Sequence, residues 1–200
     1  MQNKSHVSKD DKGNFMETYM GKKFYPLSPD SEIINLADIA HPLSMMVRFN
    51  GHCKTFYTVG QHSINVAREI ARHGFDPIYQ MYGLLHDGSE AYLADINRPA
   101  KSDLPEYVKL ESIVQAAIWE AFGLKDPSEQ IWGVVKYFDD TVLFNEAQHL
   151  MPCRHWCQHD FERLPQIDLS VRNPSDVEKE FVELFFELRD YLVSQVENED

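Results

Sequence analysis

A histidine and an aspartate stand together at the end of an apolar stretch, in the run Tyr82-Gly-Leu-Leu-His-Asp-Gly-Ser-Glu90. Polar side chains in such a place point inward or into a cleft, where they must be paired or must bind a ligand. A second pair, His159-Asp160, lies in a polar segment, where we expect it to be solvated. His86 and Asp87 are therefore the candidates for chemistry.

More residues of metal-binding type lie along the chain. His62 begins the preceding apolar stretch, and Asp139 stands among apolar residues, where a carboxylate needs a partner; its neighbour Asp140 is the alternative. Glu90 follows His86 by four residues, which puts both on one side if the turn continues. Two imidazoles and two carboxylates suit a divalent cation such as Mn, Fe, Co, Ni or Zn. They leave positions open for water and a substrate oxygen, as metal-assisted hydrolysis requires.

Helices are predicted to hold these residues. Apolar residues recur with helical spacing over 61–72, 77–87, 105–122 and 128–150, and a capping box at Ser175 and Glu178 predicts a last helix. A short helix over 35–40 is expected to break at His41-Pro42. Residues 54–59 are read as a short strand or an extended approach, and 88–103 as mixed turns. We expect a flexible arm over 1–18 and a single all-α domain, a helical bundle with a metal site between helices, over 19–200.

Composition excludes several classes of protein. The chain has 200 residues, 43% of them hydrophobic, and a formal net charge of −13. Global disorder is excluded, and the acidic balance argues against a nucleic-acid polymer as partner, so phosphate chemistry would depend on a metal or a few local cations. No apolar run approaches a membrane span, and the polar beginning lacks a signal peptide, so no membrane partner is expected. Three cysteines cannot make a disulfide framework, which favours a cytoplasmic location.

The segment 153–159 alternates thiols and imidazoles, at Cys153, His155, Cys157 and His159. Structural zinc sites use wider spacings within each ligand pair, so we interpret this segment as a surface loop.

The order His62, His86-Asp87 and Asp139 resembles that of the HD-domain metal-dependent phosphohydrolases. The run His86-Asp-Gly-Ser-Glu-Ala-Tyr-Leu-Ala-Asp-Ile-Asn-Arg-Pro-Ala-Lys101 is similar to a branch with two kinds of member. These are bacterial deoxyribonucleoside 5′-nucleotidases (the YfbR type) and phage dATP triphosphohydrolases (the DatZ type), and the second resemblance is the greater. The resemblance to this branch spans about residues 21–151, and Gly88 stands where the branch usually has alanine.

The resemblance implies roles for particular residues. His62, His86, Asp87 and Asp139 would bind the metal; Glu90 would orient or activate the attacking water; Asp95 would protonate the leaving 5′ oxygen; Arg48 and Lys101 would hold phosphate oxygens; and Phe49 would pack on the sugar or base. Simpler readings remain for three of them. Arg48 would tie down a carboxylate within the fold, Phe49 would belong to the core, and Lys101 would be an ordinary surface lysine.

The resemblance also implies an activity. A divalent metal (Co, Mn, Zn or Mg) would assist water in attacking the α-phosphorus of dATP, giving deoxyadenosine and triphosphate. Such an enzyme would deplete dATP where another purine, 2-aminoadenine, replaces adenine, in the host cytoplasm if the protein is phage-encoded. A 5′-deoxyribonucleotidase acting on deoxynucleoside monophosphates is one alternative, and a non-catalytic nucleotide-binding module is another. Family members assemble, so a homo-oligomer is expected.

Overall fold

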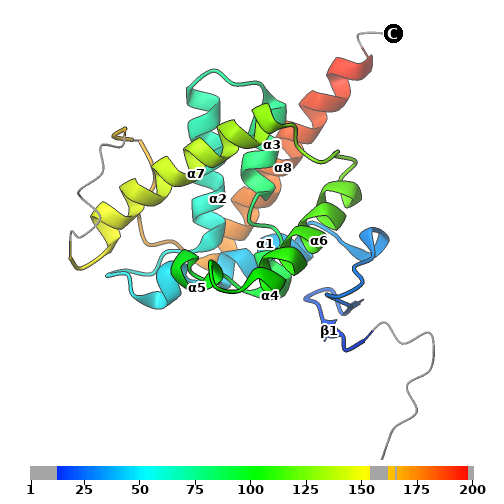
Figure 1. Cartoon of the computed structure of the whole chain (residues 1–200). Helices are drawn as coiled ribbons and strands as arrows, with labels where there is room; N and C mark the ends of the chain where they lie inside the picture. Colours follow the sequence, from blue (N-terminus) through cyan, green and yellow to red (C-terminus); the bar gives the residue numbers. More distant parts are fainter. Residues whose placement is uncertain (1–12, 154–161, 165, 198–200) are drawn as a thin grey trace, which may run out of the picture.

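The structure is a computed structural model that describes residues 13–153, 162–164 and 166–197 (Figure 1). The described part is mostly helical, which confirms the all-α prediction. Its small sheet pairs β1 (Met16–Glu17) antiparallel with β2 (Lys23–Phe24). The predicted arm is therefore too long at its end, because Met16 and Glu17 belong to this hairpin; residues 1–12 lie outside the described residues.

The helices follow in the order that the apolar spacing predicts. They are α1 (Ala37–Met45), α2 (Val59–Arg72), α3 (Pro77–Leu85), α4 (Glu90–Leu93), α5 (Arg98–Lys101), α6 (Pro105–Ala121), α7 (Glu129–Leu150) and α8 (Pro174–Glu197), with 3-10 turns η1 (Ser31–Ile33) and η2 (Arg48–Gly51). The region 88–103, expected to be mixed turns, contains the short helices α4 and α5. Residues 54–59 are an extended approach to α2, in which Thr58 makes an isolated antiparallel bridge with Val47.

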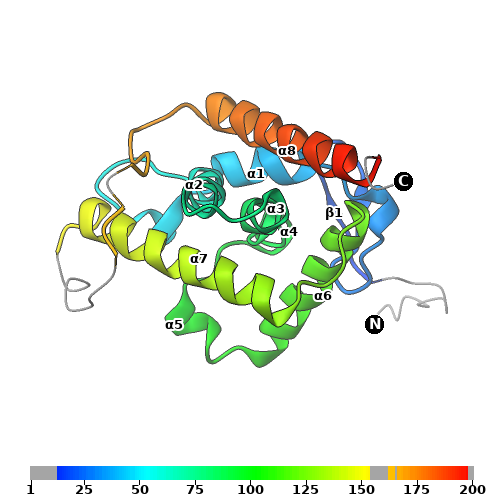
Figure 2. The same ribbon diagram turned by 90° about the horizontal axis from the view of Figure 1, so that it is seen from above.

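Helices α2 and α3 form the centre of the bundle. Figure 2 shows them nearly end-on, with α8 and α1 on one side and α7 on the other; α2 and α3 pack on each other, and both contact α7 and α8. Helix α6 packs against α4 and α5 at the edge of the bundle. The carboxyl end of α3 therefore meets the middle of α7, where the predicted ligands lie.

Local signals explain where the central helices begin and how closely they pack. Thr58 and Gln61 form a reciprocal capping box at the start of α2, and Pro77 opens α3. In α3, a Cβ on Gly83 would lie 2.6 Å from Ile70 Cδ1 of α2. The absence of a side chain at Gly83 thus allows the two helices to approach each other closely.

Two predicted helix boundaries are wrong. Helix α1 continues through Pro42, because Ile39 and Leu43 on either side of it are fully buried. Each such side chain contributes about 1.5–3 kcal/mol, which offsets a proline cost of about 3 kcal/mol. Helix α8 begins at Pro174, so Ser175 lies inside it, and Glu178 accepts a hydrogen bond from His41 of α1 instead of completing a capping box.

Within the described residues, no helix has both the length and the apolar character needed to cross a membrane.

Candidate metal centre and its cavity

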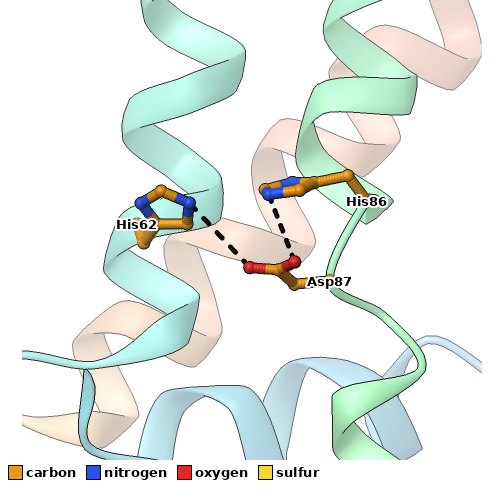
Figure 3. A group of neighbouring side chains, drawn as sticks. All are labelled: His62, His86 and Asp87. Carbon is orange, nitrogen blue, oxygen red and sulfur yellow. Dashed lines mark ion pairs between the residues drawn. The ribbon is translucent and has the colours of Figure 1, made fainter. Parts of the chain in front are cut away.

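Three predicted ligands meet between α2 and α3. His62 lies on α2, while His86 and Asp87 directly follow the last turn of α3 (Figure 3). The Asp87 carboxylate lies between the two imidazoles, with Oδ2 3.9 Å from His62 Nε2 and Oδ1 3.3 Å from His86 Nε2. One ligand atom from each residue lies within 4.8 Å of the others, so the group is able to hold a metal ion.

The hydrogen bonding of His86 fits a ligand role. Its Nδ1 lies 2.8 Å from the carbonyl oxygen of Gly83, which accepts a hydrogen bond from Nδ1–H and thereby leaves Nε2 as the lone-pair nitrogen. Nε2 is buried and has no hydrogen-bond partner. A buried polar atom in this state requires an explanation, and coordination of a cation provides one. The donor set of two imidazoles and a carboxylate suits a divalent transition metal.

The structure also distinguishes the two aspartates of α7. Asp139 Oδ1 lies 3.2 Å from His62 Nε2 and 3.8 Å from His86 Nε2, so Asp139 faces the two imidazoles of the candidate group. Burial raises the pKa of Asp139, but its hydrogen bond with His62 and the nearby imidazole of His86 outweigh burial and hold that pKa well below its usual value. Asp140 Oδ1 instead contacts Arg98 and Lys136. Of the two candidates, Asp139 is the one that lies beside the imidazoles.

A second carboxylate of α7, Glu146, was not predicted. It is fully buried and accepts hydrogen bonds from Tyr57 Oη (2.7 Å), His62 Nδ1 (2.9 Å) and Arg48 (3.3 Å). Glu146 follows Asp139 by seven residues, which places both on one face of a helix, and this spacing was the available signal. Glu146 therefore orients His62 so that Nε2 points toward Asp87 and Asp139.

The pKa values in this network follow from its charges. Burial and Arg48 lower the pKa of His62, but Glu146 and Asp139 outweigh them and raise it to about 9. Burial raises the pKa of Glu146, but His62 and Arg48 outweigh it, so the pKa lies below its usual value. Without a metal, His62 is thus an imidazolium held by carboxylates on both sides.

The structure shows one of the two roles considered for Arg48, the pairing of carboxylates within the fold. Its guanidinium is buried against Glu146 and lies 3.8 Å from Asp87, so it does tie carboxylates together within the fold. It also lines a large cavity beside His86 and Asp87, and its Nε has no hydrogen-bond partner among the described residues. The two residues after it are Phe49 and Asn50, with φ of 55° and 50°. Such left-handed backbone in non-glycine residues is costly and is often found at functional sites.

The three remaining predicted residues line the same cavity. Glu90 is buried and its Oε2 is unpartnered; burial, then Asp87 and Asp95, raise its pKa well above the usual value. Burial is also the main reason that the pKa of Asp95 is raised. Lys101 Nζ donates to Glu111 at 2.7 Å and lies 3.8 Å from Glu90, so it is a paired residue of the cavity wall and not an ordinary surface lysine.

The cavity beside the candidate metal ligands has a volume of about 750 Å³. All of the predicted site residues except His62 line this cavity, namely Arg48, Phe49, His86, Asp87, Glu90, Asp95, Lys101 and Asp139. His62 lies behind them. The cavity also contains residues that sequence reasoning missed, namely Arg98, Trp132, Lys136 and Leu143. Four cations (Arg48, Arg98, Lys101 and Lys136) line this cavity beside five carboxylates (Asp87, Glu90, Asp95, Glu111 and Asp139). Such a cavity can hold an anionic organic molecule with one end at the ligand group.

The segment with alternating thiols and imidazoles is only partly described. Cys153 is exposed, while His155, Cys157 and His159 lie outside the described residues, as does the His159-Asp160 pair.

Comparison with known proteins finds relatives of this sequence. No protein-family model matches the chain. The uncharacterized protein YfdR of Escherichia coli (strain K12) is 35% identical over 139 residues, which are 68% of this chain and 72% of YfdR. The chain belongs to the YfdR family. The uncharacterized protein RCAP_rcc00048 of Rhodobacter capsulatus is 34% identical over 109 residues, which are 52% of this chain and 56% of that protein.

Proposed function

We propose that the chain is an HD-domain metal-dependent phosphohydrolase that acts on deoxynucleotides, most specifically one that converts dATP and water into deoxyadenosine and triphosphate. The observation that carries the proposal is the unpartnered, buried Nε2 of His86. It faces His62, Asp87 and Asp139 at the wall of a cavity that also contains a free carboxylate oxygen and several cations.

A divalent metal bound by these residues would supply positive charge for the phosphoryl oxygens and for the attacking water. Arg48 and Lys101 supply further positive charge at the cavity wall, where they can hold phosphate oxygens. The transition state of phosphoryl transfer gains most from such charge.

Two carboxylates are available for proton transfer. Glu90 would accept a proton from the water that attacks the α-phosphorus, since a base works best when its pKa lies near the working pH and burial raises that of Glu90. Asp95, whose pKa burial also raises, would donate a proton to the 5′ oxygen as the bond between phosphorus and that oxygen breaks. The water oxygen would remain on the released triphosphate.

The test is product analysis of the purified protein with each dNTP and each dNMP, in Mn, Co, Mg, Zn and EDTA. Deoxyadenosine with intact triphosphate from dATP is expected, with no product in EDTA. Cleavage of monophosphates alone would make the protein a 5′-deoxyribonucleotidase.

A pair of histidine variants tests the metal centre in the same assay. His86→Ala is expected to abolish turnover, whereas His149→Ala serves as the control, because His149 is exposed and, among the described residues, its hydrogen bond is to Asn145 O of its own helix. Absence of turnover under every condition, or undiminished turnover in His86→Ala, would refute the proposal.

A further inference from the structure

Two cations that the mechanism does not use lie together in the cavity. Arg98 of α5 and Lys136 of α7 both line it. Arg98 donates to Asp139 Oδ2 at 2.8 Å and to Asp140 Oδ1, and Lys136 contacts the same two oxygens at 2.6 and 3.2 Å. The guanidinium and the ammonium are thus held side by side, next to a predicted metal ligand.

Both cations are accessible from the cavity. Their side chains are 48% and 44% exposed, compared with 9% for Arg48. Ion pairs with this much solvent contribute little to stability, so either cation can exchange a carboxylate for a stronger anion at low cost. If Asp139 also ligates a metal, its charge is shared, and positive charge remains at Arg98 and Lys136.

Helix α7 gives the cavity a direction. Lys136, Asp139 and Leu143 lie on one face of it, and at the helical rise Lys136 is about 4.5 Å before Asp139 while Leu143 is about 6 Å after it. The carboxyl end of α7 meets the loop of Phe49, because Lys54 N donates to Leu150 O. Leu143, Met151 and Phe49 are thus the apolar lining residues on the carboxyl side of Asp139, next to Arg48. Arg98 and Lys136 are the cations on its other side, where Trp132 also lines the cavity.

We infer that Arg98 and Lys136 form a subsite for the phosphates beyond the one attacked, and that the nucleoside lies toward Phe49, Leu143 and Met151. The inference rests on the proposed function and adds to it a reason for preferring triphosphates. A guanidinium fork and an adjacent ammonium together match the oxygens of a polyphosphate chain, while a monophosphate ends before it reaches them.

The first experiment measures binding of inorganic tripolyphosphate and of orthophosphate to the full chain by calorimetry, in the presence of Mn. The double variant Arg98→Ala/Lys136→Ala is expected to bind tripolyphosphate at least tenfold more weakly, with orthophosphate binding changed less than threefold. The charge-retaining variant Arg98→Lys/Lys136→Arg should stay within threefold of the wild type. The control Lys109→Ala/Arg189→Ala removes the same charge from exposed positions on α6 and α8 and should change neither affinity.

Turnover provides a second readout. The ratio of kcat/KM for dATP to that for dAMP should fall at least tenfold in the double variant, whereas a mere effect on Asp139 and the metal would lower both values equally. Because Arg98 and Lys136 are well exposed, the single variants Arg98→Gln and Lys136→Gln replace the double variant if it fails to fold.

Failure of the subsite and failure of the proposed function give different results. If the wild type binds no tripolyphosphate, or if both anions lose affinity equally, the subsite is refuted. If dATP is hydrolysed and the ratio does not change, the subsite is refuted and the function stands. If no nucleotide is hydrolysed but tripolyphosphate binding still depends on Arg98 and Lys136, the subsite stands and the function does not.

Discussion

The buried carboxylate of Glu146 allows a quantitative test of how the centre is built. Glu146→Gln keeps the shape of the side chain and one acceptor oxygen. Tyr57 and His62 Nδ1 both donate to Oε1, so the new amide nitrogen must take the place of Oε2, where it faces a donor of Arg48. Two hydrogen-bonded contacts can therefore survive, and the charged contact to Arg48 is lost.

The expected cost follows from that one contact. A hydrogen bond between charged groups contributes about 1.5–3 kcal/mol. For a chain of this length each kcal/mol lowers Tm by about 2–4 °C, so a decrease of about 3–12 °C is expected. Loss of the negative charge beside His62 Nδ1 also makes His62 Nε2 a weaker metal ligand. Removal of a partner of this kind typically lowers metal affinity about 10–100-fold, and a decrease in that range is expected for Glu146→Gln.

Thermal unfolding in EDTA and competition with a chelator for Mn measure these two effects separately. Glu183→Gln is the matched control, because Glu183 is exposed on α8 and contacts only Lys179, at 3.7 Å, among the ion pairs of the described residues. It should change neither quantity. A Glu146→Gln variant with unaltered Mn affinity would refute the conclusion that Glu146 positions His62 for a metal.

Three more predictions follow from the contacts around the site. Because the pKa of metal-free His62 is about 9, binding of Mn at pH 7.5 should release about one proton, and the affinity for Mn should increase as pH rises toward 9. Calorimetry in buffers of different ionisation enthalpy measures the number of protons released. Absence of proton release would contradict a role for His62 Nε2 as a metal ligand. Because the pKa of Glu90 is raised in the folded state, the free energy of unfolding of the metal-free protein should fall as pH rises from the usual glutamate pKa through the raised one. In urea unfolding, Glu90→Gln should therefore be more stable than the wild type at pH 8, with a smaller difference at pH 5. Its turnover should fall about 10²–10⁴-fold. Gly83→Ala should lower the free energy of unfolding by about 1–3 kcal/mol, because the new Cβ would overpack against Ile70 Cδ1. Ile70→Val removes that atom, so the double variant should be more stable than the sum of the two single effects predicts. Strict additivity in urea unfolding would refute the contact.

Much of the helical framework was predictable because its signals are local. The apolar spacing that predicts α2, α3, α6 and α7 depends on residues within a few turns of one another, and the structure has helices at all four places. His86-Asp87 at the end of α3 was predictable for the same reason. The two errors at Pro42 and at the start of α8 occurred where contacts with distant residues outweighed a local signal, namely burial of Ile39 and Leu43 and the bond between His41 and Glu178.

The composition of the site was decided by tertiary structure. Sequence alone proposed His62, His86 and Asp87 as ligands by residue type, but only the packing of α2 against α3 brings their donor atoms within 4.8 Å. The choice of Asp139 over Asp140 depends on which face of α7 meets the centre. Glu146 and Arg98 were missed because their partners, His62 and Asp139, are distant in sequence. Lys136 pairs with Asp139 of its own helix, but only the packing of α7 decides that this face of the helix lines the cavity.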